Sequence, residues 1–79
     1  MFDFKITLTS INQVRKFVND ACSQMCDIDI ISGRYVIDAK SIMGLFSLDT
    51  TKPLTVSVKG SQEEYEAFRE LCKDIIVKD

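Results

Sequence analysis

Apolar and polar residues alternate strictly over residues 2–9 of the chain. This period of two predicts a strand at residues 2–9 that has one face buried and the other in water. The period then lengthens to that of a helix, behind Ser10 and Gln13, which fit a capping box. The inward residues predicted for the strand are Phe2, Phe4, Ile6 and Leu8. Those predicted for the helix are Val14, Phe17, Val18, Ala21, Cys22 and Met25.

Two short apolar runs on either side of Ser32-Gly33 predict a β-hairpin over residues 27–38. A short helical pattern occupies residues 42–48 and is broken by the polar run 49–53. Alternation returns at 54–58 and predicts a fourth strand. Ser61 and Glu64 fit a second capping box that opens a last helix. The residues that this helix is expected to bury are Tyr65, Phe68, Leu71, Cys72, Ile75 and, at its end, Ile76.

The predicted element order is therefore β-α-β-β-α-β-α over a single domain, residues 1–79. Each long helix has one apolar stripe and the outer strands have one apolar face. The simplest way to bury them is a four-stranded antiparallel sheet with the helices on one face, an α+β open-faced sandwich. A chain of 79 residues makes one small domain of modest stability.

Composition limits the classes of function. Twelve acidic and ten basic residues give a net charge of -2, and the basic residues are scattered, so we expect no nucleic-acid partner. No apolar run is long enough for a membrane span, and no secretory leader is visible, so we expect a cytoplasmic protein without membrane insertion. No phosphate-binding glycine loop, nucleophile elbow or general acid–base pair occurs. We therefore expect neither an enzyme nor a cofactor.

Three cysteines, Cys22, Cys26 and Cys72, are the strongest candidates for metal chemistry. Structural zinc sites generally use four Cys or His ligands, and the chain has no histidine and no fourth cysteine. We interpret the three as buried free thiols. Asp27 and Asp29 flank Ile28 on a predicted strand. They could bind a cation weakly, but a solvated strand edge is the simpler interpretation.

Packing does not explain every apolar residue at 42–48. Five of these seven positions are apolar, in a helix too short to be wholly buried. If Leu45 and Leu48 face the core, then Ile42, Met43 and Phe46 face solvent and form a docking patch. The alternative is that the short helix lies deeper and that all five residues are core. Both interpretations stay open on the pattern alone.

Ser41 stands directly before this helix, at the position of an N-cap. An ordinary capping serine is one interpretation. The other is a phosphorylation site, because a phosphoryl group adds about -1.5 to -2 charges near the positive end of the helix. It would then lie beside the patch and could switch an interface without unfolding the protein.

The segment Lys40-Ser41-Ile42-Met43-Gly44, followed by two apolar residues and Ser47-Leu48, resembles the regulatory serine segment of HPr. HPr is the phosphocarrier family of the bacterial sugar phosphotransferase system. The element order and Val58-Lys59-Gly60-Ser61 are also similar to this family. The resemblance implies an HPr-like sandwich in which Ser41 is the serine that HPr kinase/phosphorylase modifies. It further implies that Ile42, Met43 and Phe46 dock that kinase, enzyme I or a transcriptional regulator.

The sequence departs from the family at the site of phosphate transfer. HPr carries its acceptor histidine in a loop before the first helix, with an arginine and a proline, whereas this chain has no histidine and its loop is shortened. Ser10 stands near the acceptor position at a helix N-terminus, where an anion is favoured. A serine phosphoester is far less labile than a phosphohistidine, so we interpret Ser10 as a cap.

Three hypotheses follow. The first is a regulatory HPr-like protein in catabolite repression or the regulation of sugar transport, which carries no phosphate and is switched at Ser41. The second is an HPr-fold adaptor unrelated to sugar transport, with a constitutive docking patch. The third, an active phosphocarrier, requires an acceptor other than histidine.

Overall fold

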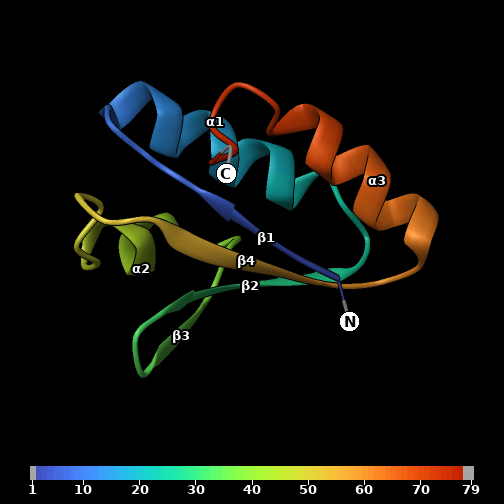
Figure 1. Cartoon of the computed structure of the whole chain (residues 1–79), viewed down its shortest axis with the longest axis horizontal. Coiled ribbons are helices and arrows are strands. Elements are labelled where there is room, and N and C mark those ends of the chain that lie inside the picture. Colours follow the sequence, from blue (N-terminus) through green and yellow to red (C-terminus); the bar gives the residue numbers. More distant parts are fainter. Residues whose placement is uncertain (1, 78–79) are drawn as a thin grey trace.

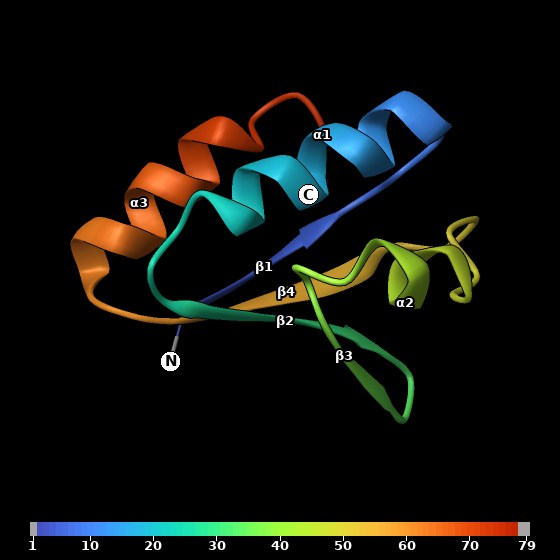
Figure 2. The same ribbon diagram turned by 180° about the vertical axis from the view of Figure 1, so that it is seen from behind.

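The fold places four strands in one antiparallel sheet, in the order β1-β4-β2-β3. It was obtained as a computed structural model that describes residues 2–77. Figures 1 and 2 show that α1 and α3 cover one face of this sheet. The predicted α+β fold and its βαββαβα order are confirmed. The elements are β1 (Phe2–Ile6), α1 (Ile11–Cys22), β2 (Asp27–Ser32), β3 (Tyr35–Asp38), α2 (Ile42–Phe46), β4 (Leu54–Lys59) and α3 (Gln62–Leu71).

The core lies between the sheet and the helices. Antiparallel register aligns Phe4 of β1, Val56 of β4 and Ile30 of β2 across the sheet, on the same face. Phe17 of α1 and Phe68 of α3 close this core with ring centroids 5.6 Å apart. Burying each such side chain contributes about 1.5–3 kcal/mol, so the apolar alternation is the main determinant of the fold.

Both long helices begin at the predicted serines, but their caps differ. Ser10 Oγ accepts a hydrogen bond from the Gln13 amide at 3.1 Å, whereas the Gln13 side chain reaches back to the Thr9 amide at 2.7 Å. The predicted box at Ser10 is therefore wrong in its second half, because the glutamine bonds one residue further back. At α3 the box is complete: Ser61 and Glu64 each accept from the other's backbone amide.

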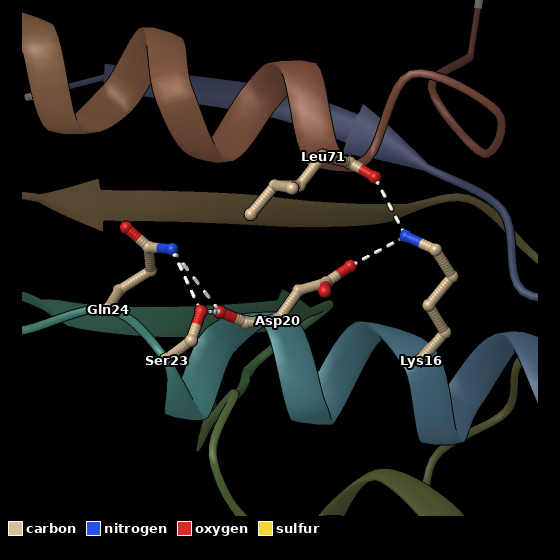
Figure 3. Close-up of polar contacts among 5 residues, drawn as sticks. All are labelled: Lys16, Asp20, Ser23, Gln24 and Leu71. Carbon is tan, nitrogen blue, oxygen red and sulfur yellow. Dashed lines mark hydrogen bonds and ion pairs between the residues drawn. The ribbon is translucent and has the colours of Figure 1, made fainter.

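The predicted helix α1 was too long at its C-terminus. Ser23 Oγ and Gln24 Nε2 both donate to the Asp20 carbonyl and end the helix, as Figure 3 shows. Met25 therefore lies beyond the helix and is 98% exposed, and Cys22 in the last turn is also exposed. The prediction that these two residues are buried is wrong.

The chain after α3 turns back onto the edge strand β1. Ile76 forms a β-bridge with Ile6, and the Val77 amide donates to the Lys5 carbonyl at 2.9 Å. Ile75 and Ile76 are half-buried against the core by this return, rather than by the helix predicted for them. Leu71 ends α3 and stays 41% exposed, contrary to the prediction.

A lysine joins the two long helices on the outside of the core. Lys16 Nζ of α1 lies 2.7 Å from a carboxylate oxygen of Asp20 and 3.0 Å from the carbonyl of Leu71, at the C-terminus of α3 (Figure 3). A cation is favoured at a helix C-terminus, where carbonyl groups lack partners. Lys16 thus links α1 to α3, and its hydrogen bond to Asp20 raises its pKa.

Candidate functional site

Ser41 is the N-cap of α2, as the sequence predicted. Its Oγ accepts from the Gly44 amide at 3.2 Å and its carbonyl accepts from the Leu45 amide at 3.1 Å. The Ser41 amide in turn donates to the carbonyl of Asp38, the last residue of β3. The side chain is exposed, so the hydroxyl is accessible to a modifying enzyme although it caps the helix.

Gly44 lets α2 approach β3 closely. A Cβ atom at this position would lie 2.6 Å from Ile37 Cγ2 and 3.2 Å from Ser41 Oγ. Contacts between carbon atoms are favourable at about 3.5–4.0 Å, so any larger residue displaces α2 or Ile37. The position of Ser41 therefore depends on a glycine three residues later.

The apolar residues of α2 divide between core and solvent. Leu45 is fully buried, whereas Met43 is 78% and Phe46 is 48% exposed. Ile42 and Leu48 are half-buried and pack against the core. The expected exposed patch thus holds for Met43 and Phe46. It fails for Ile42, because this residue starts the helix on the side that faces the core.

The exposed end of α2 borders a hollow shared with the start of α1. Its volume is about 280 Å³, and Ile11 of α1 and Phe46 of α2 both line it. Ile11 is 61% exposed, and the sequence interpretation did not include it in the patch. It lies three residues before Val14, on the apolar side of α1. This helical spacing is the sequence signal that could have identified it. The other lining residues are Leu8, Thr9, Ser10, Val14, Leu48 and Thr50.

A second cavity shares no residue with α2. It measures about 160 Å³ and lies between α1 and the end of α3, with Phe17 and Ile75 in its wall and Lys16 at its polar side. It holds none of the predicted site residues.

The cysteines do not assemble a site. Cys26 and Cys72 are buried and Cys22 is exposed, so burial was predicted wrongly for Cys22 alone. Burial raises the pKa of the Cys72 thiol to about 12, and burial together with the Glu64 carboxylate raises that of Cys26. Within residues 2–77 no three Cys, Asp or Glu side chains lie close enough to hold a metal ion.

Asp29, considered above beside Asp27, is paired with a lysine. Lys59 Nζ lies 2.8 Å from its carboxylate on the open face of the sheet, and this hydrogen bond raises the pKa of Lys59.

Among the helices that the structure describes, none is long and apolar enough to cross a membrane.

A known protein family matches nearly the whole of this chain. Residues 5–75 match the sequence profile described as the PTS HPr component phosphorylation site. The chain belongs to the HPr family. The matched range includes Ser41, all of α2 and the β1–α1 connection, and it contains no histidine.

Two solved HPr structures share the fold. HPr-C-His from Thermoanaerobacter tengcongensis is 24% identical with a TM-score of 0.76, over 94% of this chain and 93% of that one. The phosphocarrier protein HPr from Bacillus anthracis str. Ames is 25% identical with a TM-score of 0.73, over 94% and 95%. A search of curated proteins gave no match. The likeness to the first structure supports the HPr fold alone.

Proposed function

We propose that this HPr-family chain is a regulatory binding protein, not an enzyme, that does not carry phosphate. One observation supports this most directly: the family match runs from residue 5 to 75 and includes no histidine. The family's phosphate relay needs a labile phosphohistidine. The hydroxyl of Ser10 lies at the start of α1, near the position of the family's acceptor. It accepts a hydrogen bond from the Gln13 amide and serves as a cap.

We further propose that phosphorylation of Ser41 switches the interactions of this protein. The support is that Ser41 is exposed and caps the helix α2, on which Met43 and Phe46 are exposed. A phosphoryl group would add about -1.5 to -2 charges there. The ammonium group of Lys40, next to Ser41 in the chain, already donates a hydrogen bond to the Gln24 carbonyl at 3.1 Å. A phosphate on Ser41 would therefore act mainly on the docked partner rather than on Lys40.

The implied partners are proteins of the phosphotransferase system. HPr kinase/phosphorylase would modify Ser41, and enzyme I or a transcriptional regulator would dock on Met43, Phe46 and, at its buried margin, Ile42. Ile11 adds a residue from α1 to this docking surface across the shared hollow. These partners would place the protein in the cytoplasm, in the regulation of sugar transport and catabolite repression.

The test is incubation with HPr kinase and ATP, followed by mass spectrometry. We expect one phosphate on the wild type and none on Ser41→Ala, with Ser47→Ala as the matched control that still accepts it. Phosphate on Ser41→Ala at the wild-type rate would refute the switch. A parallel incubation with enzyme I and phosphoenolpyruvate should give no acid-labile adduct, and an adduct would refute the loss of phosphate transfer.

A second candidate function is a constitutive adaptor unrelated to sugar transport. It is favoured by the Ser41 hydroxyl, which already caps α2 as an accepting group. Binding to immobilised HPr kinase separates the two. The switch predicts that Ser41→Asp and Phe46→Ala both change the affinity. The adaptor predicts that Ser41→Asp leaves the affinity for its partner unchanged, while Phe46→Ala weakens it.

A further inference from the structure

The two edges of the sheet differ in how they are covered. β1 is partly covered by the returning chain, through the Ile6–Ile76 bridge and the hydrogen bond from the Thr7 amide to the Ile75 carbonyl. β3 is the other edge, and Figures 1 and 2 show no strand or helix of residues 2–77 along its outer side. Tyr35 and Val36 are 65% and 63% exposed on it. An uncovered edge strand is a template for pairing with another chain.

The register defines which backbone groups of β3 point outward. The Ala39 amide donates to the Ile28 carbonyl at 2.9 Å, and the β2–β3 register pairs Ile30 with Ile37 and Ser32 with Tyr35. Hydrogen-bonded pairs alternate along an antiparallel ladder, so the amides of residues 35, 37 and 39 point toward β2. Those of Val36 and Asp38 therefore point away from the sheet.

We propose that β3 pairs with β3 of a second copy of this chain, antiparallel and about a two-fold axis at Val36. In this register Val36 faces Val36 of the second copy as a hydrogen-bonded pair, which uses the outward amides. Tyr35 then faces Ile37 of the second copy. Arg34, in the turn directly before β3, faces Asp38 of the second copy, and by symmetry Asp38 faces Arg34.

Charge complementarity is the argument for a second copy of this chain rather than another occupant. Asp38 lies opposite Asp29 in the β2–β3 register, and Lys59 is paired with Asp29. Within residues 2–77 neither Arg34 nor Asp38 makes an ion pair. The two-fold register brings these opposite charges together twice. Opposite charges that face each other across two strands are favourable, and like charges are unfavourable.

The side-chain pairs also fit this register. Directly opposed residues lie on the same face of a sheet, so Tyr35 of one copy joins Ile37 of the other on the helix-covered face. Ile37 is half-buried there beside α2, and an aromatic ring would cover its remaining surface. β3 has only four residues, so we expect weak, reversible association at high concentration rather than an obligate dimer.

Two charge reversals test the register. Arg34→Asp and Asp38→Arg each place like charges opposite each other, so each variant alone should remain monomeric. An equimolar mixture should associate again, because both facing pairs then become opposite in charge. Sedimentation equilibrium between about 10 μM and 1 mM covers the range of a weak dimer. Arg69→Asp on α3 is the matched control and should associate like the wild type.

Val36→Pro tests the backbone pairing. Proline is tolerated on an edge strand where the amide faces outward, so the fold should persist, as far-ultraviolet circular dichroism would show. Loss of two cross-strand hydrogen bonds should raise the dissociation constant about tenfold or more. In hydrogen exchange of the wild type, the Val36 amide should become protected as concentration rises, while the Ile37 amide is unchanged.

Three results would overturn the proposal. The wild type could remain monomeric at about 1 mM. Association could persist in Val36→Pro, which would place the contact on another surface. The mixed charge variants could fail to associate while each is folded, which would show that Arg34 and Asp38 do not face each other and would leave the edge to a different occupant.

Discussion

Replacing Gly44 with alanine should destabilise the protein, although alanine favours helices. The added Cβ would lie 2.6 Å from Ile37 Cγ2, about 1 Å inside a favourable carbon contact. Ile37 is β-branched, so its Cγ2 can move only by rotation of a stiff χ1 angle or by displacement of the backbone.

The two opposing effects can be compared in size. Alanine is more favourable than glycine inside a helix by at most about 1 kcal/mol. Inserting a methyl group into packed space costs about 1–3 kcal/mol. We therefore expect Gly44→Ala to lower the free energy of unfolding by up to about 2 kcal/mol. We also expect it to lengthen the bond from the Gly44 amide to Ser41 Oγ, now 3.2 Å, because α2 must shift.

Urea unfolding of a double-mutant cycle with Ile37→Ala measures this effect. Ile37→Ala removes the Cγ2 atom, so Gly44→Ala in that background should be neutral or stabilising. The coupling between the two changes should then equal the steric cost, about 1–3 kcal/mol. If Gly44→Ala costs the same in both backgrounds, close approach to Ile37 is not the reason for a glycine at this position.

Three further predictions concern the thiols and the capping of α3. A chromogenic disulfide reagent should modify Cys22 in the native protein, and Cys26 and Cys72 only on unfolding, because these two are buried. Burial raises the pKa of Cys72 from its ordinary value of 9.0 to about 12, so the folded state keeps this thiol protonated where the unfolded state ionises it. The resulting contribution to the free energy of unfolding is present in full below pH 9 and is lost as the pH rises toward 12. Cys72→Ala should therefore lose less stability than the wild type between pH 9 and 12. Ser61→Ala should lower the free energy of unfolding by about 1 kcal/mol, with Gln62→Ala as the control, because Ser61 Oγ accepts from the amide of residue 64.

Local periodicity was sufficient to predict the fold. Alternation at Phe4 and Ile6 and the helical stripe through Val14 and Phe17 report directly which residues are buried, because burial dominates folding energy. The cap at Ser41 was also predictable, since an N-cap is a local motif.

The remaining features depend on contacts between segments far apart in the sequence. Met25 continues the apolar stripe of α1, yet the caps at Ser23 and Gln24 end the helix before it. Ile11 lies on the apolar side of α1, but whether it is buried or left exposed beside α2 depends on the packing of the whole fold. Gly44 is an unremarked glycine until the distance to Ile37 is known.

The contacts that hold Ser41 are independent of the segment in which the family carries its histidine. Ser41 is fixed by the Asp38 carbonyl, the Gly44 amide and the approach of α2 to Ile37. None of these contacts involves the connection between β1 and α1, where the family carries its histidine. Leu8, Thr9 and Ser10 of that connection line the hollow that Phe46 of α2 also lines. We therefore expect changes in the connection to alter one wall of this hollow and to leave the position of Ser41 intact.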